Sequence, residues 1–189
     1  MKIRESGMPE LEQWESYFDI ESIFRKFGVG AQLQHVVEFG CGYGTFTLPA
    51  AQRIGGRVSA YDIDPRMISI TRQRMRQAAI DNIDLHQRDF MLKGTGLADG
   101  SADFVMLFNI LHGDNPHTLL HEAHRLLKAD GRLAIMHWRY DEETPRGPPM
   151  NIRPRPRDCR DWAENAGFTI NQRHYDLPPY HYGLIARPA

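Results

Sequence analysis

The stretch that decides the fold is Val37-Glu38-Phe39-Gly40-Cys41-Gly42-Tyr43-Gly44-Thr45. An apolar run at 35–39, typical of a strand, leads into glycines at alternate positions, and residues 45–53 continue with a helical pattern. Glycine is needed there because the chain must turn sharply and must lack Cβ atoms where a ligand lies against the backbone. The helix that follows directs its positive end toward that ligand. The stretch therefore predicts a strand, a binding loop and a helix.

The rest of the chain continues this alternation of strands and helices. We expect further strands at 57–61, 82–88, 102–108, 132–138, 168–174 and 181–186, and helices at 9–27, 65–79, 116–128 and 157–166. Strands that alternate with helices indicate a doubly wound parallel sheet with right-handed crossovers. The last two strands have no helix between them, so they should be antiparallel. The predicted fold is a single α/β, Rossmann-like domain at 31–189, with seven mostly parallel strands and an antiparallel last strand. Residues 1–30 form an N-terminal helical cap or lid.

Length and composition limit the possible classes of protein. The chain has 189 residues, 41% hydrophobic and 25% charged, which suits one globular domain. A formal net charge of −1 argues against a protein whose main function is to bind nucleic acid or an anionic membrane. No segment is apolar enough to span a bilayer, and the charged N-terminus is not a secretory signal. Cys41 and Cys159 make neither a disulfide framework nor a zinc site, so we expect a cytoplasmic protein.

The spacing of the glycines separates two kinds of nucleotide-binding loop. Dinucleotide enzymes use G-x-G-x-x-G, whereas here the third glycine comes one residue earlier. Together with the acidic residue two positions before it, the loop resembles the first motif of the class I S-adenosylmethionine-dependent methyltransferases. The match extends over roughly 33–187, with the approaches to the fourth strand at 97–105 and to the fifth at 124–133. The chain looks most like the type 11, small-molecule branch of that family.

The resemblance implies a set of cofactor-binding residues. In the family, an acidic residue at the end of the second strand accepts hydrogen bonds from both ribose hydroxyls, and Asp62 stands there. An aspartate and an apolar residue after the third strand contact the adenine, and Asp89 and Phe90 match them. The full set is Glu38, Gly40, Cys41, Gly42, Gly44, Asp62, Ile63, Asp89, Phe90 and Asn109. The implied cofactor is S-adenosyl-L-methionine, with S-adenosyl-L-homocysteine as product.

Simpler interpretations of three of these residues stay open. Cys41 is a small buried filler in the loop rather than a nucleophile. Asp62 and Asp89 could each be no more than a turn residue at the end of a strand.

Other functions compete with methyl transfer to a small molecule. A non-catalytic cofactor-binding subunit would share the same crevice. An NAD-type oxidoreductase is disfavoured because Thr45 stands where its loop needs glycine or alanine. A nucleic-acid methyltransferase is disfavoured by the charge balance and because Asn109-Ile110-Leu111-His112 replaces an Asn/Asp-Pro-Pro-Tyr motif after the fourth strand. We therefore expect a small-molecule acceptor and neither a nucleic-acid nor a membrane partner.

His112 and His137 are the candidate catalytic residues. Both follow apolar strands, at the carboxyl ends of the fourth and fifth strands, where a base that deprotonates an acceptor would lie. The alternative is that each histidine caps a strand end by bonding to backbone. A base matters only for a hydroxyl or a protonated amine, because the sulfonium already carries its leaving group.

Two further features, both on predicted helices, bear on function. His117, His121 and His124 form one row on a helix, turned away from the apolar stripe, so we expect a solvent-facing row and no metal. Glu21 falls within the apolar face of the N-terminal helix. It either faces the cofactor or substrate from a lid, or sits at the rim and pairs with an arginine.

The loop at 139–157 is rich in arginine and proline. Prolines stiffen the run from Asn151 to Arg157, and its alternating guanidinium groups suit carboxylate or phosphate recognition. This hypothesis favours an acceptor with an anionic or polar group. The alternative is a solvated connector in a chain whose basic residues are nearly all arginine.

Overall fold

The computed structural model describes residues 8–171 and 174–189. Two compact units make up the chain, Met1–Gly96 and Leu97–Ala189. Helices α1 (Leu11–Glu15) and α2 (Ile20–Phe27) belong to the first unit, where one continuous helix at 9–27 was expected. The helix breaks because the Asp19 side chain accepts the Ser22 N–H and begins α2 anew, and Gly28 ends α2 at φ 68°. The cap boundary at residue 30 stays a prediction, and residues 1–7 of that cap lie outside the described residues.

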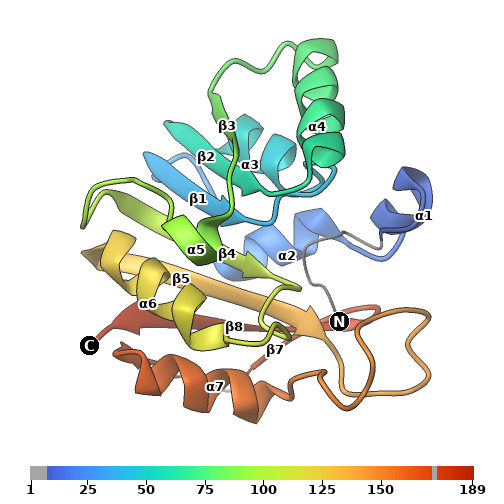
Figure 1. The fold of residues 1–189 in the computed structure, drawn as a ribbon, viewed down its shortest axis with the longest axis vertical. Coiled ribbons are helices and arrows are strands. Elements are labelled where there is room, and N and C mark those ends of the chain that lie inside the picture. The colour runs from blue at the N-terminus through green and yellow to red at the C-terminus, as the bar shows by residue number, and fades with distance from the viewer. Residues whose placement is uncertain (1–7, 172–173) are drawn as a thin grey trace. The chain divides into compact units, whose positions relative to one another are not determined.

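The first unit contains three parallel strands in the order β3, β2, β1 (Figure 1). They are β1 (His35–Phe39), β2 (Arg57–Asp62) and β3 (Ile83–Gln87), joined by α3 (Thr47–Arg53) and α4 (Pro65–Gln77). Both helices pack on β2 and β3. Asp64 caps α4 and Pro65 occupies its first turn, so the helix begins at residue 65, where the sequence predicts it. A short helix that was not predicted, α5 (Phe90–Lys93), follows β3.

The second unit contains the other strands, in the order β4, β5, β8, β6, with β7 also paired to β8. They are β4 (Ala102–Phe108), β5 (Leu127–Trp138), β6 (Phe168–Thr169), β7 (Tyr175–Leu177) and β8 (His181–Pro188). β4 and β5 are parallel, whereas β8 is antiparallel to β5, β6 and β7. Helices α6 (Pro116–Leu126) and α7 (Pro156–Asn165) pack on this unit's strands.

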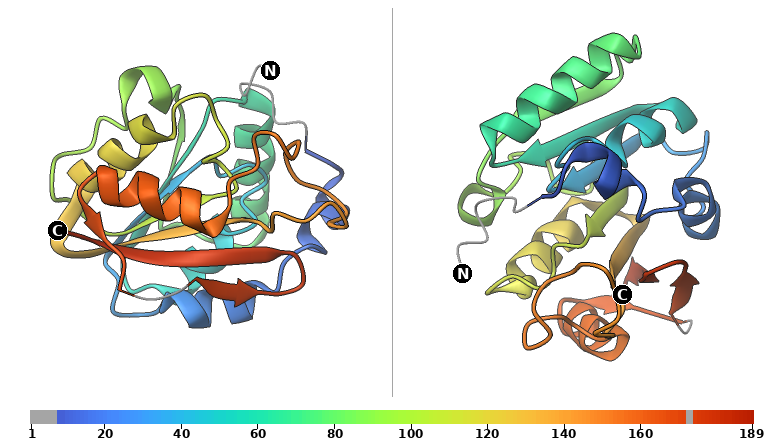
Figure 2. Two further views of the ribbon diagram at one scale, coloured as in Figure 1. Left: turned by 90° about the horizontal axis from the view of Figure 1, so that it is seen from below. Right: turned by 90° about the vertical axis from the view of Figure 1, so that its right-hand side faces the viewer.

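The expected antiparallel ending of the sheet is confirmed, but its strand count differs. The described residues hold eight strands rather than seven. The expected strand at 168–174 divides into β6 and β7, and residues 172–173 of it lie outside the described part of the chain. The loop at 139–155 runs out from β5 and returns to α7 (Figure 2).

The core of each unit is built from its strands. Val36, Val37 and Val58 are fully buried in the first unit, and the apolar run from Phe104 to Leu107 is fully buried in the second. That burial on both faces is what a central parallel strand requires. Within the described residues, no helix is both long and apolar enough to cross a membrane.

The turn before β2 depends on a close backbone approach at Gly56. A Cβ atom at Gly56 would overlap the backbone carbonyl of Gln34, whereas one at Gly30 would meet only the flexible tip of Gln32. We predict that Gly56→Ala lowers the free energy of unfolding by about 1–3 kcal/mol, because the backbone must shift. Gly30→Ala is the matched control and should be near neutral. Urea unfolding measures both, and equal stability of the two variants would contradict the prediction.

Candidate functional site

The glycine loop turns directly after β1. Gly40, Gly42 and Gly44 have φ values of 74°, 54° and 76°, a region that favours glycine strongly. The N–H groups of Gly40 and Cys41 both donate to the Tyr61 carbonyl, at 2.8 and 2.9 Å. The three glycines predicted to form the turn therefore do so, and the turn is tied to the end of β2.

Asp62 secures this loop from its place at the end of β2. Its Oδ2 accepts the Gly42 N–H at 2.8 Å, and its Oδ1 accepts the Asp64 N–H at 2.9 Å. Burial raises the pKa of Asp62, and these two backbone hydrogen bonds oppose the rise. The carboxylate is thus both a turn residue, as the simpler interpretation expected, and a buried negative charge beside the glycine loop.

Glu38 is a second buried carboxylate, on β1. The Thr47 hydroxyl, on α3, donates to Glu38 Oε2 at 2.5 Å. Burial raises the pKa of Glu38 to about 8, and the nearby Asp62 charge adds to the rise. Cys41 lies between Glu38 and Asp62 in the sequence, and burial raises the pKa of its thiol as well. A buried thiol of this kind is a poor nucleophile, in agreement with its expected role as a filler.

The N-terminal segment makes contacts with the glycine loop that the sequence did not predict. Arg74, on α4, donates to the Tyr43 carbonyl at 2.8 Å and to Glu15 Oε1 at 2.6 Å. The Thr45 hydroxyl also donates to Glu15, at 3.3 Å, and the Tyr43 hydroxyl donates to the Pro9 carbonyl at 2.8 Å. Nothing in the local pattern around Glu15 signals this role, because its partners lie 30 and 59 residues away.

The two residues predicted for the adenine end, Asp89 and Phe90, follow β3. Asp89 is half-buried, and its Oδ1 accepts the Leu92 N–H at 3.2 Å, which caps α5. Phe90 is buried and packs its edge against Phe39, with ring centroids 5.2 Å apart. Ile63 is half-buried next to Asp62. Nine of the ten cofactor residues predicted from the sequence thus belong to the first unit, around the carboxyl ends of its three strands.

The tenth, Asn109, lies in the second unit among histidines. It follows β4 with φ 55°, and its Nδ2 is 3.4 Å from Nε2 of His181. The two candidate catalytic residues lie in the same unit, where Nδ1 of His112 is 3.2 Å from Nε2 of His137. The structure therefore brings His112 and His137 together as a hydrogen-bonded pair, which neither of the sequence-based interpretations foresaw.

Burial keeps these histidines in the neutral form. It lowers the pKa of His112, of His137 and of His181, and for His181 the value falls to about 3. The positive charge of Arg139 lowers the His181 value further.

Glu21 lies at the rim of α2. Its side chain is exposed and forms an ion pair with Arg53. This confirms the rim position with an arginine partner and not the alternative of a carboxylate facing a ligand.

The row on α6 is less uniform than expected. His121 is exposed, but His117 and His124 are half-buried, and the His124 ring stands edge-on to Phe168 at 5.1 Å. Among residues 8–171 and 174–189 there is no group of three or more His, Cys, Asp or Glu side chains placed to hold a metal ion.

Arg153 points into its own loop and not into a binding site. Only 8% of the residue is exposed. Its guanidinium donates to five acceptors, the carbonyls of Arg139, Asp141, Arg146 and Pro148 and the hydroxyl of Thr144. Arg155 instead stacks on the Tyr140 ring at 4.0 Å. The alternating arginines therefore differ in role, and Arg153 holds the loop together through these hydrogen bonds.

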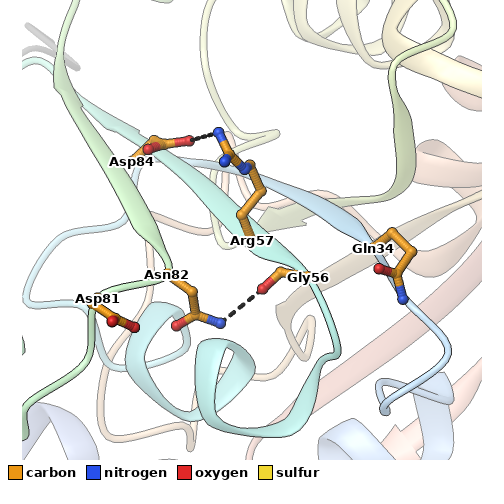
Figure 3. A pocket seen from close by; sticks show the side chains of 6 residues that line it. All are labelled: Gln34, Gly56, Arg57, Asp81, Asn82 and Asp84. Atoms are coloured by element: carbon orange, nitrogen blue, oxygen red, sulfur yellow. Dashed lines mark hydrogen bonds and ion pairs between the residues drawn. The ribbon is translucent and has the colours of Figure 1, made fainter.

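A polar hollow of about 470 Å³ lies at the amino ends of the first unit's strands (Figure 3). Two interactions join groups that line it, because Arg57 pairs with Asp84 and Asn82 donates to the Gly56 carbonyl. The glycine loop follows the carboxyl end of β1, so this hollow is not the predicted cofactor site.

The chain belongs to a methyltransferase family. Residues 36–131 match the family model described as a methyltransferase domain. No curated protein matches the chain. Solved structures do, and they confirm the predicted α/β, Rossmann-like fold.

Three of these structures illustrate the likeness. A SAM-dependent methyltransferase from Aquifex aeolicus is 23% identical with a TM-score of 0.83, over 95% of this chain and 94% of its own. A putative type 11 methyltransferase from Sulfolobus solfataricus is 24% identical with a TM-score of 0.68, over 89% and 91%. Magnesium protoporphyrin IX methyltransferase from Synechocystis PCC 6803, solved with bound SAH, is 19% identical with a TM-score of 0.68, over 99% and 91%.

The raised pKa of Glu38 predicts how stability depends on pH. A carboxyl whose pKa rises from 4.5 to about 8 on folding favours the folded state fully below pH 4.5. That contribution is lost as pH rises through about 8. Glutamine does not titrate, so Glu38→Gln should not lose stability in this way. We predict that the free energy of unfolding of the variant rises relative to that of the wild type between pH 5 and pH 8. Chemical denaturation across that range measures it, with Glu12→Gln on the exposed side of α1 as the control. Parallel pH profiles for Glu38→Gln and wild type would contradict the prediction.

The inward guanidinium of Arg153 predicts a structural effect. We expect Arg153→Ala to destabilise the second unit by about 1.5–3 kcal/mol, because several hydrogen bonds from one charged group are lost. The loop at 139–155 should also become sensitive to proteinase K. Arg157→Ala is the control, because that side chain is 77% exposed. Equal resistance of the two variants to the protease would show that Arg153 does not hold the loop.

Proposed function

We propose that this protein transfers a methyl group from S-adenosylmethionine to a small-molecule acceptor and releases S-adenosylhomocysteine. The observation that carries the proposal is the glycine loop, with three glycines at positive φ and the buried Asp62 carboxylate bonded to its centre. The match to the methyltransferase domain family supports it, as does the SAH bound in the Synechocystis relative. We also propose a cytoplasmic location, which the two free, buried cysteines support.

The residues of the first unit suit this cofactor. Gly42 has a φ of 54°, and a Cβ atom there would lie 3.1 Å from the end of the Met8 side chain, so the turn favours glycine. Two buried carboxyl groups, Glu38 and Asp62, lie beside the loop, and a cationic ligand would favour their ionised forms. In our proposal Asp62 binds the ribose hydroxyls, Asp89 the adenine amino group, and Ile63 and Phe90 flank the ring. The glycine loop and Glu38 hold the amino-acid end.

Catalysis by such a site rests mainly on position. When bound, the cofactor supplies an electrophilic methyl group on a sulfonium that is its own leaving group. The protein must hold the acceptor in line with that methyl and exclude water, and orientation of this kind can lower a barrier by about 7–11 kcal/mol. His112 and His137 are the candidates for removing a proton from the acceptor, a step that adds about 10²–10⁴-fold.

The proposal predicts the behaviour of an Asp62 variant. Asp62→Asn should weaken binding of S-adenosylhomocysteine by about 10- to 150-fold, since charged hydrogen bonds to two hydroxyls are worth about 1.5–3 kcal/mol. Titration calorimetry measures the affinity. Asp84→Asn is the control, because Asp84 pairs with Arg57 at the polar hollow. An unchanged dissociation constant for Asp62→Asn would show that the ribose does not lie at Asp62. Binding of NAD by the wild type, without binding of S-adenosylhomocysteine, would overturn the proposed function itself.

A further inference from the structure

Four polar side chains meet within the second unit where β4 and β5 end and β8 begins. They form two pairs, His112 with His137 and Asn109 with His181. Two of their buried atoms, Nδ1 of His137 and Oδ1 of Asn109, have no hydrogen-bond partner in the described part of the chain. Buried polar atoms without partners are rare and call for a functional reason.

Access distinguishes the two members of the histidine pair. His137 is completely buried, and the register of β5 against β8 places it opposite Tyr182. His112 is half-buried, on the segment between β4 and α6. Its Nδ1 is directed at His137, and we infer from its partial exposure that its other nitrogen, Nε2, is the one that an acceptor can approach. A base must reach the proton that it removes, and only His112 meets that condition.

The hydrogen bond between the rings then fixes where the protons are. If Nε2 of His112 is to accept a proton, Nδ1 of His112 must carry one and donate it to Nε2 of His137. His137 in turn must carry its own proton on Nδ1. Once His112 has become an imidazolium, its bond to the neutral His137 becomes charge-assisted and stronger.

We propose that His112 removes the proton from a neutral hydroxyl on the acceptor through Nε2, and that His137 is a positioning residue that holds His112 in the reactive tautomer. This inference rests on the proposed methyltransferase function and names the chemical class of its acceptor. In the step, the acceptor oxygen forms a bond to the methyl carbon while the carbon–sulfur bond breaks and its electron pair returns to sulfur. The hydroxyl proton goes to His112 Nε2.

The charged and titratable groups around the pair favour a hydroxyl over other acceptors. Arg153 and His181 both act on His137, and Tyr182 lies beside it with ring centroids 6.3 Å apart. Because His137 is completely buried, a cation beside the pair would be poorly solvated, so a protonated amine is an unfavourable neighbour. A carboxylate acceptor has no proton to lose, so it would not use a neutral histidine as a base. A phenol or enol has a proton to lose and is uncharged before the reaction.

Nitrogen-15 NMR of the imidazole groups tests the tautomer in the free protein without any acceptor. At pH 7 we expect a proton on Nδ1 and none on Nε2 of His112. His137→Gln, whose amide oxygen can still accept, should preserve this pattern. His137→Leu should return His112 to the Nε2-protonated form, while the exposed His121→Gln control leaves the spectrum of His112 unchanged. A wild-type His112 with its proton on Nε2 would overturn the proposal, whatever the fate of the leucine variant.

The acceptor class is tested with the protein loaded with S-adenosylhomocysteine. Phenol should shift the His112 Nε2 resonance, and benzoate, which matches it in size but is anionic, should not. A shift with benzoate alone, or with neither probe, would overturn the hydroxyl assignment. If S-adenosylhomocysteine fails to bind at all, the proposed function fails, whereas the tautomer measurement on the free protein still stands or falls by its own result.

Kinetics with a phenol or enol that the protein methylates would then distinguish a positioning role of His137 from a merely structural one. We expect His112→Gln to lower kcat by about 10²-fold or more with little change in KM. His137→Leu should lower kcat in the same direction, and His137→Gln should restore most of it. The wild-type rate should fall at low pH, when His112 becomes protonated, and this dependence should disappear in His112→Gln. Equal losses in the two His137 variants would indicate a merely structural role.

Discussion

The Asp62 carboxylate accepts two backbone N–H groups at once, and the arrangement of the first unit depends on it. One N–H belongs to Gly42, in the loop after β1, and the other belongs to Asp64, at the beginning of α4. A single buried side chain thereby fixes the conformation of the glycine loop and the entry into a helix. The Thr71 hydroxyl on that helix donates to the Gly42 carbonyl at 2.8 Å, so the helix also contacts the glycine loop directly. Both hydrogen-bonding groups of Gly42 are therefore used within the protein, and the loop is shaped before any ligand arrives.

This arrangement places two carboxyl groups close together in a buried environment. Glu38 and Asp62 lie on adjacent parallel strands, and their described hydrogen bonds come from neutral donors, a threonine hydroxyl and backbone N–H groups. Burying a carboxylate without a cation is unfavourable, which is why the pKa of each is raised. A ligand that brings positive charge relieves this cost. The proposed cofactor brings a sulfonium and an ammonium, and methyl transfer removes the first of these, so the same carboxylates favour the methyl donor over the product.

The sequence predicted those parts of the molecule that local pattern determines. The turn at Gly40, Gly42 and Gly44, the beginning of α4 at residue 65 and the strand at 102–108 each follow from nearby residues. Contacts between distant residues could not be read in this way. Glu15 meets Arg74 only because α1 folds back to the loop, and the basic pattern around Arg153 suggested an anion site when the guanidinium in fact binds carbonyls of its own loop. A charge pattern gives the type of group present but not the direction in which it points.

The histidine cluster shows the same limit at the level of strand register. Two antiparallel closing strands were predicted, but the pairing of β8 with β5 could not be, and that pairing places Tyr182 opposite His137 and His181 opposite Trp138. Side chains alternate between the two faces of a strand, so a slip of one residue would exchange the positions of His181 and Tyr182. Asn109 would then lose its contact with His181, and the hydroxyl of Tyr182 would leave Cys159 and the Pro154 carbonyl. The register of one strand pair thus determines which polar groups surround the proposed base, and it is set by the packing of the whole second unit.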